Sequence, residues 1–177
     1  MLENFILLYR HYGGVLSLLR SGYFCTAALL AFVATFFSDG RAWSDIASSV
    51  LPSLVGFSVA SFAIIVAVLS KNQIEALLAP DARGKAPLLK VAASIGHAVV
   101  IQIFAILFAI IYELTEREQA LDLCKFGDSV DHCQSFIEHF ASTLNTIGLF
   151  LFLYGVVLVL AAIFSIFRMI MSLSKAI

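Results

Sequence analysis

The sequence predicts an all-α, polytopic integral membrane protein with four transmembrane helices and with both termini cytoplasmic. The 177 residues are 61% hydrophobic and 13% charged, with a mean hydropathy of +0.99, whereas a soluble domain carries about 25% charged residues. Uncharged apolar stretches of the length that a helix needs to cross a bilayer recur along the chain. We treat residues 1–177 as one transmembrane domain. The predicted spans are residues 21–38, 50–69, 91–112 and 143–167.

The N-terminal residues 2–12 are apolar but too short to cross a membrane, and Gly13-Gly14 interrupts them. They fit either a short helix that lies in the headgroup layer or a cytosolic extension of the first span. The first span follows, with Arg20 able to extend to the interface. Cys25 lies within this span, where we expect it to be a packing residue.

The second span, residues 50–69, has a regular pattern of small residues at alternating spacings of three and four. They are Ser53, Gly56, Ala60, Ala63, Ala67 and Ser70. A helix places all six on one face, and small residues let another helix backbone come close in lipid. We therefore expect this helix to be the packing core. Pro52 suits the first turn of a helix that begins near Ser49, whereas a start at Ser44 would make it a kink.

The predicted cytoplasmic loop, residues 71–90, is basic and begins with an apolar helical face of Ile74, Leu77 and Leu78. We expect the second helix to continue for about two turns before Pro80, Gly84 and Pro87 break it. The basic residues of the loop are Lys71, Arg83, Lys85 and Lys90. This surface fits contact with anionic lipid headgroups or docking of a cytosolic protein. Nucleic-acid contact is a third interpretation, but the patch is small and lacks aromatics, so none is expected.

The predicted outer loop, residues 113–142, is acidic and contains Cys124 and Cys133. A disulfide between them is chemically permitted if this side is a periplasm. The alternatives are unpaired thiols, or a metal site that adds His132 and His139. The spacing matches no standard zinc pattern, so no metal site is expected.

The last span, residues 143–167, has small residues that repeat every seven positions, at Gly148, Gly155 and Ala162. This repeat predicts a second close-packing face. Ser135 and Glu138 match a capping box that would begin this helix.

Charge predicts the orientation of the four spans. The side that holds both termini would carry eight of the eleven basic residues and three of the twelve acidic ones. Because basic residues in short loops stay on the cytoplasmic side, both termini are predicted to be cytoplasmic. In a bacterium this topology would place the chain in the inner membrane as a multi-pass protein.

The chemistry-bearing residues within the spans are few. No nucleophile-elbow, zinc-protease or phosphate-loop motif is present, so we expect neither an enzyme nor a cofactor. His97 is the ionisable residue within a predicted span, and such residues often mark ion or proton paths. Gln102 and Asn145 are expected to bond neighbouring helices rather than line a pore.

Two functions fit this pattern. Small-residue faces on several spans predict a homo-oligomer in the bilayer. In the first interpretation the oligomer is a non-enzymatic sensor or anchor that couples an envelope signal to a cytosolic protein partner. In the second it is a pore or channel. The residues near a water path would then include Ser53, Ser58, Ser61, Gln102 and Asn145.

The overall plan, a short chain with four spans, basic inner loops and no catalytic motif, resembles the membrane proteins of bacterial anti-phage systems. It is similar in size and plan to the membrane protein of the Kiwa system. The resemblance implies an oligomer that works with a cytosolic DNA-binding partner against infecting phage. It covers the architecture and assigns no residue.

Overall fold

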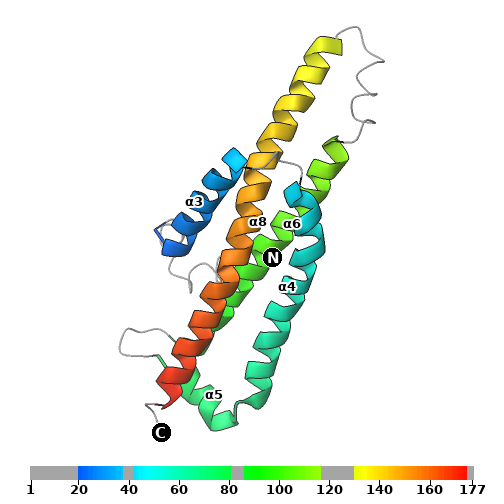
Figure 1. Cartoon of the computed structure of the whole chain (residues 1–177). Coiled ribbons are helices and arrows are strands. Elements are labelled where there is room, and N and C mark those ends of the chain that lie inside the picture. Colours follow the sequence, from blue (N-terminus) through cyan, green and yellow to red (C-terminus); the bar gives the residue numbers. More distant parts are fainter. Residues whose placement is uncertain (1–19, 38–41, 81–85, 117–129, 175–177) are drawn as a thin grey trace.

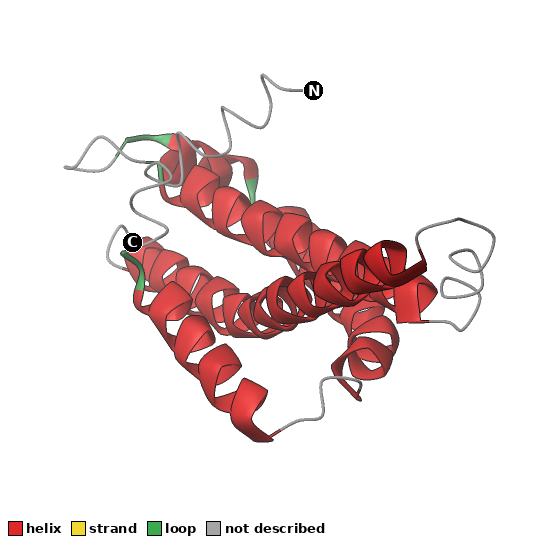
Figure 2. Ribbon diagram, turned by 90° about the horizontal axis from the view of Figure 1, so that it is seen from above, coloured by secondary structure: helices red, strands yellow, loops and turns green. Residues whose placement is uncertain are grey.

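The computed structural model describes residues 20–37, 42–80, 86–116 and 130–174, which are helical apart from short turns and contain no strand (Figure 2). Within them lie α3 (Gly22–Phe37), α4 (Ala42–Val68), α5 (Lys71–Leu78), α6 (Pro87–Glu116) and α8 (Val130–Ser174). Stretches of α4, α6 and α8 are long and apolar enough to cross a membrane. The described part of the chain is thus all-α, as predicted, and three of its helices could cross a membrane, whereas four spans were predicted. The predicted interfacial segment 2–12 lies outside the described residues.

The antiparallel helices α6 and α8 form the centre of the bundle, and α8 contacts all the other described helices (Figure 1). Segment 50–69 was expected to be the packing core, and this expectation is wrong. α4 packs on α6 and α8 through one face, and most of its membrane-length stretch is exposed. α8 takes the central place because its buried side includes small residues such as Gly148, Gly155 and Ala161, which let neighbouring helices approach.

Three clusters of buried apolar residues succeed one another along the bundle. The first joins α4, α6 and α8 around Trp43 and Tyr112. The second joins α3 to α6 and α8 around Tyr154, and the third joins α5 to α6 and α8 around Leu77. α4, α3 and α5 therefore each contribute buried residues to one cluster, whereas α6 and α8 contribute to all three.

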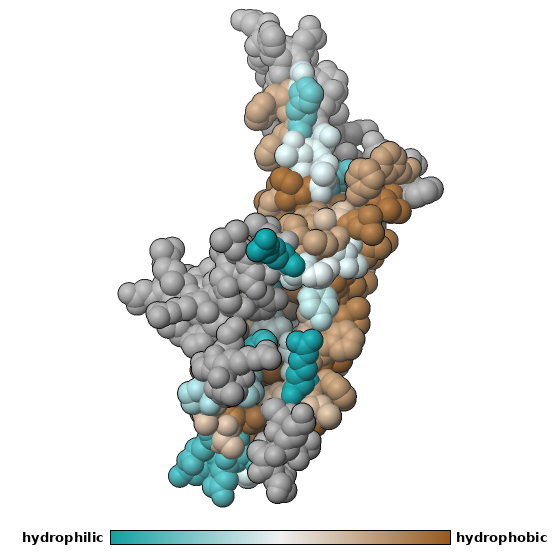
Figure 3. Space-filling view, turned by 90° about the vertical axis from the view of Figure 1, so that its left-hand side faces the viewer, coloured by the Kyte–Doolittle hydropathy of each residue, from teal (hydrophilic) through white to brown (hydrophobic). Residues whose placement is uncertain are grey.

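Two groups of residues, one toward each end of the bundle, are here called its belts. At one end the Trp43 and Tyr112 rings lie 5.7 Å apart, and Trp43 Nε1 donates a hydrogen bond to Asn145 Oδ1. At the other end Lys90 and Arg168 are exposed. Tyr112 is 22 residues after Lys90 in α6, a rise of about 33 Å in a helix, close to the roughly 30 Å thickness of a bilayer core. Figure 3 shows hydrophobic side chains over much of the middle of the molecule and a hydrophilic group at its lower end.

The helices are longer than the predicted spans. α4 begins at Ala42, so Pro52 lies inside it rather than in its first turn. α6 extends beyond span 91–112 at both ends, and α8 begins at Val130 and includes Ser135 well inside it. The predicted capping box at Ser135 and Glu138 is therefore wrong. The 45 residues of α8 rise about 67 Å, and its N-terminal end projects past the other helices (Figure 1).

α5 is a separate helix rather than a continuation of α4. The Ser70 hydroxyl accepts from the Gln73 backbone N–H, and the Gln73 side chain accepts from the Ser70 N–H. This reciprocal cap begins a new helix, which ends at Leu78, two residues before Pro80. Pro87 then starts α6, in a first position where its missing N–H costs nothing.

α3 is shorter than the other apolar helices and lies beside one half of α8 (Figure 1). In its first turn, Phe24 packs edge-on against Phe150 and Tyr154, far from the Arg168 end of α8. Nearer its other end, Ala34 packs on the cluster that contains Trp43. The 16 residues of α3 rise about 24 Å. α3 matches the predicted segment 21–38 in sequence but is too short to reach from one belt to the other.

Candidate functional site

The small-residue face of α4 (Ser53, Gly56, Ala60, Ala63 and Ala67) points away from the bundle, and every one of these residues is exposed. A helix turns about 100° per residue, so the buried residues Leu51 and Ser58 lie on the opposite face. Phe57 and Ile64, 59% and 63% exposed, border the small-residue face on one side, and Val59 and Val66, 53% and 37% exposed, border it on the other. The small-residue face is thus a shallow strip between large apolar side chains.

The glycines of α4 and α8 stand in contrasting surroundings. A Cβ at Gly56 would meet nothing within 4 Å. A Cβ at Gly148 would overlap the Trp43 indole, and one at Gly155 would lie 3.1 Å from Gln102 Cγ. Ala162 is also buried, in the cluster around Leu77. Gly148, Gly155 and Ala162 therefore pack within the chain, whereas Gly56 is free to admit another chain.

The polar residues of the predicted spans lie between helices and bond within the chain. His97 is buried, and its Nε2 lies 3.1 Å from the Tyr154 hydroxyl. Gln102 Nε2 donates to the Gly155 carbonyl at 3.2 Å, while its Oε1 has no hydrogen-bond partner among the described residues. Asn145 accepts from Trp43, and the Ser58 hydroxyl donates to the Leu54 carbonyl of its own helix.

The apolar face of α5 packs back onto the bundle. Leu77 is 3% exposed and lies with Val91 and Met169 in one cluster, against which the half-buried Ile74 also packs. Leu78 is 43% exposed. Lys71 and Lys90 are exposed, and Arg83 and Lys85 lie outside the described residues. Of the contact residues predicted on α5, Lys71 and Leu78 are therefore exposed, whereas Ile74 and Leu77 pack on the bundle.

The predicted cysteine pair, Cys124 and Cys133, has no described side chains, so the disulfide stays a prediction. Cys25 was expected to be a packing residue, but it is exposed on α3. Where side chains are described, no group of three His, Cys, Asp or Glu residues could hold a metal ion.

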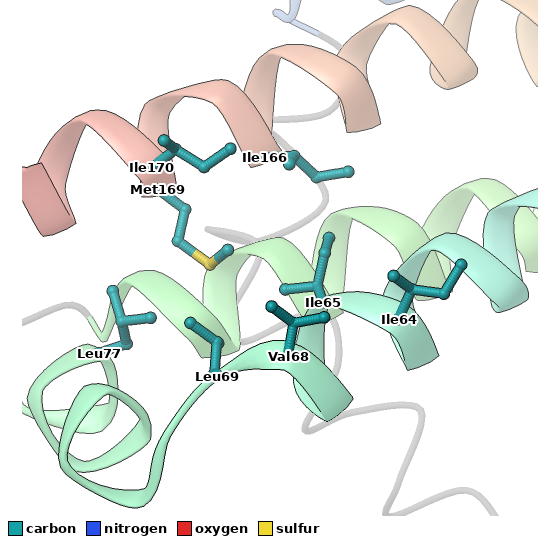
Figure 4. A pocket seen from close by; sticks show the side chains of 8 residues that line it. All are labelled: Ile64, Ile65, Val68, Leu69, Leu77, Ile166, Met169 and Ile170. Atoms are coloured by element: carbon teal, nitrogen blue, oxygen red, sulfur yellow. The ribbon is translucent and has the colours of Figure 1, made fainter.

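An apolar groove lies between the C-terminal ends of α4 and α8, next to α5 (Figure 4). The groove was not predicted from the sequence, because its residues belong to three helices and all are ordinary apolar residues.

No family model, curated protein or solved structure matches this chain. The features from which a function can be inferred are the exposed small-residue face of α4 and the exposed side of α5.

Proposed function

We propose that the chain is a homo-oligomeric membrane sensor or anchor, which couples a signal at the envelope to a cytosolic protein partner and catalyses no reaction. The observation that supports this proposal is the small-residue face of α4. It lies opposite the core-packing face, is exposed along four turns and leaves open space at Gly56. In lipid, apolar burial gives little drive for helices to associate, and close approach at small residues supplies it instead.

The proposed topology has four spans, with the basic end of the bundle in the cytoplasm. At that end Lys71, Lys90 and Arg168 are exposed, as the charge rule requires of a cytoplasmic surface. Because α3 is shorter than the three helices that could cross a membrane, the first of the four spans stays a prediction. In a bacterium the membrane would be the inner membrane.

The partner-binding surface in this proposal is the exposed side of α5. Lys71 and Leu78 combine a charge with an apolar side chain, a pairing typical of the polar rim and apolar centre of interfaces. The cluster around Leu77 ties α5 to α6 and α8. A partner on α5 would therefore be connected to the helices that cross the membrane.

The projecting end of α8 would be the part that meets the envelope. It carries Phe136 and Phe140, stacked with their ring centroids 6.2 Å apart and exposed. An anti-phage role in the manner of the Kiwa membrane protein belongs to the same proposal. Its test is the plating efficiency of phages on cells that contain or lack the chain.

A pull-down from native membranes in mild detergent tests the sensor or anchor proposal. We expect a stoichiometric cytosolic protein to accompany the wild-type chain, and to be lost from a variant with Lys71→Gln and Leu78→Ala. The matched control is Ile163→Ala with Ile103→Ala, since both residues are exposed on other helices. Recovery of the chain alone, as an oligomer, would contradict the proposal and favour the pore.

In the pore alternative, the water path would have to run between copies of the chain rather than through a single copy. Ser58, Gln102 and Asn145 use hydrogen-bonding groups inside the chain, whereas Ser53 is exposed on α4. An ion flux through vesicles that contain the pure protein, reduced by Ser53→Leu, would be the outcome that favours a pore.

A further inference from the structure

We propose that the groove between α4 and α8 binds one acyl chain of an anionic phospholipid from the surrounding leaflet. The groove has a volume of about 250 Å³, and all of its lining residues are apolar. α4 and α8 supply its two walls, and Leu77 of α5 closes one end (Figure 4). This inference goes beyond the proposed function, because it assigns a ligand that neither the oligomer nor the partner requires.

The groove has a buried base and an exposed rim. At the base, Leu77 and Met169 are 3% and 4% exposed. At the rim, Ile64, Val68 and Ile170 are 63%, 79% and 54% exposed. An apolar channel that is closed behind and open in front, on helices that would cross a membrane, opens onto lipid.

The groove also lies at the right depth for a lipid whose headgroup is anionic. Leu69 of its wall is two residues before Lys71, and Met169 of its base directly follows Arg168. Both cations are exposed, and Lys90 is exposed at the same end of α6. Glu75 is the acidic residue described at this end, so the described charge is mainly positive. Basic residues at a membrane surface attract anionic headgroups.

Other occupants fit less well. A helix of a second copy needs small residues in order to approach closely, but the rim carries the branched residues Ile64, Val68 and Ile170. The small-residue face of α4 points in another direction, more than a quarter of a turn away. A peptide would need hydrogen-bond partners for its backbone, which this apolar lining does not offer. An acyl chain is thin and needs no polar contact.

Native mass spectrometry of the full chain in mild detergent tests the proposal, with phosphatidylglycerol or phosphatidylcholine of the same chains added. We expect one retained phosphatidylglycerol, preferred over phosphatidylcholine. Val68→Trp with Ile170→Trp fills the groove and should abolish retention. The control, Val59→Trp with Ile163→Trp, places the same rings at exposed sites outside the groove and should retain the lipid.

The preference for an anionic headgroup is tested by two substitutions, one that removes a positive charge and one that removes a negative charge. Lys71→Gln should lower the preference for phosphatidylglycerol about fivefold, the effect of one basic residue near a membrane surface, and Glu75→Gln should raise it. Equal retention by the groove-filled variant and the wild type would overturn the proposal. So would displacement of the lipid by glycerol phosphate, which has the headgroup chemistry but no chain.

Discussion

Gly148 and Gly56 show how the same residue type serves two purposes in one bundle. Gly148 lies where the Trp43 indole crosses α8, and Trp43 in turn bonds Asn145. Gly56 faces outward with nothing near it. The sequence predicted close packing at both positions from spacing alone. It could not separate packing within the chain from packing between chains, because that depends on which face of each helix the fold uses.

Gly148→Ala should destabilise the protein by about 1–3 kcal/mol, because the added methyl group overpacks the site and displaces Trp43. Gly56→Ala is the matched control. It should be neutral or stabilise α4 by up to about 1 kcal/mol, since alanine costs less helix entropy than glycine. Unfolding in mixed detergent micelles measures both. Equal effects of the two substitutions would contradict the placement of Gly148 against Trp43.

Gln102 is fully buried, and its amide makes one hydrogen bond, to the Gly155 carbonyl. Gln102→Met keeps the approximate volume and removes both the hydrogen bond and the unpartnered Oε1. We expect a change in unfolding free energy within about 1 kcal/mol, since hydrogen bonds between membrane helices are weak on average and an unpartnered buried oxygen is itself costly. A much larger loss, measured in the same micelles, would mean that Oε1 has a partner beyond the described residues.

Among the elements, α8 and α5 depart most from the sequence-based expectation. Hydropathy marks the apolar part of a helix and not its ends, so the polar first turns of α8 were assigned to a loop. For α5, the helix breaks at Ser70 because Ser70 and Gln73 form a local cap. The sequence-based prediction counted Ser70 in the small-residue pattern of the second span and therefore continued the helix past it. The apolar stretches of α4, α6 and α8 were predictable because lipid requires about 20 apolar residues in each crossing.

Leu77→Ala should loosen α5 from the bundle. Leu77 is almost fully buried, and such truncations cost about 2–5 kcal/mol. Leu78→Ala is the control. Leu78 is exposed, so its truncation should change the unfolding free energy by no more than about 0.5 kcal/mol. Limited proteolysis measures cleavage after Lys71 in both variants. Faster cleavage in both, or in neither, would count against the packing of α5 through Leu77.

At the scale of the whole molecule, the proposed orientation rests on the two belts and on an uneven charge distribution. The sequence predicted the basic side from loop charges, and the structure adds that Lys90 and Tyr112 lie about one bilayer thickness apart along α6. Whether α4 packs against a second copy was not predictable from the sequence. A small-residue pattern indicates close helix packing but not whether the neighbouring helix belongs to the same chain.

The orientation is tested by labelling single cysteines with a membrane-impermeant reagent, after Cys25, Cys124 and Cys133 are changed to Ser. His139→Cys, on the projecting end of α8, should react in intact cells. Lys71→Cys should react only after the membrane is opened, because the proposed topology places the basic end in the cytoplasm. The reverse pattern would place the basic end outside and exclude a cytosolic partner on α5.

The central claim is that copies of the chain assemble through the small-residue face of α4, and the mass of the assembly in mild detergent tests it most directly. Gly56→Leu should reduce the oligomer to the mass of a single chain, because the side chain fills the strip that a neighbouring backbone would occupy. Gly22→Leu, at a glycine of α3 that also has open space around it, should leave the oligomer intact. An oligomer of unchanged mass in Gly56→Leu, or a wild-type chain that is already monomeric, would contradict the claim.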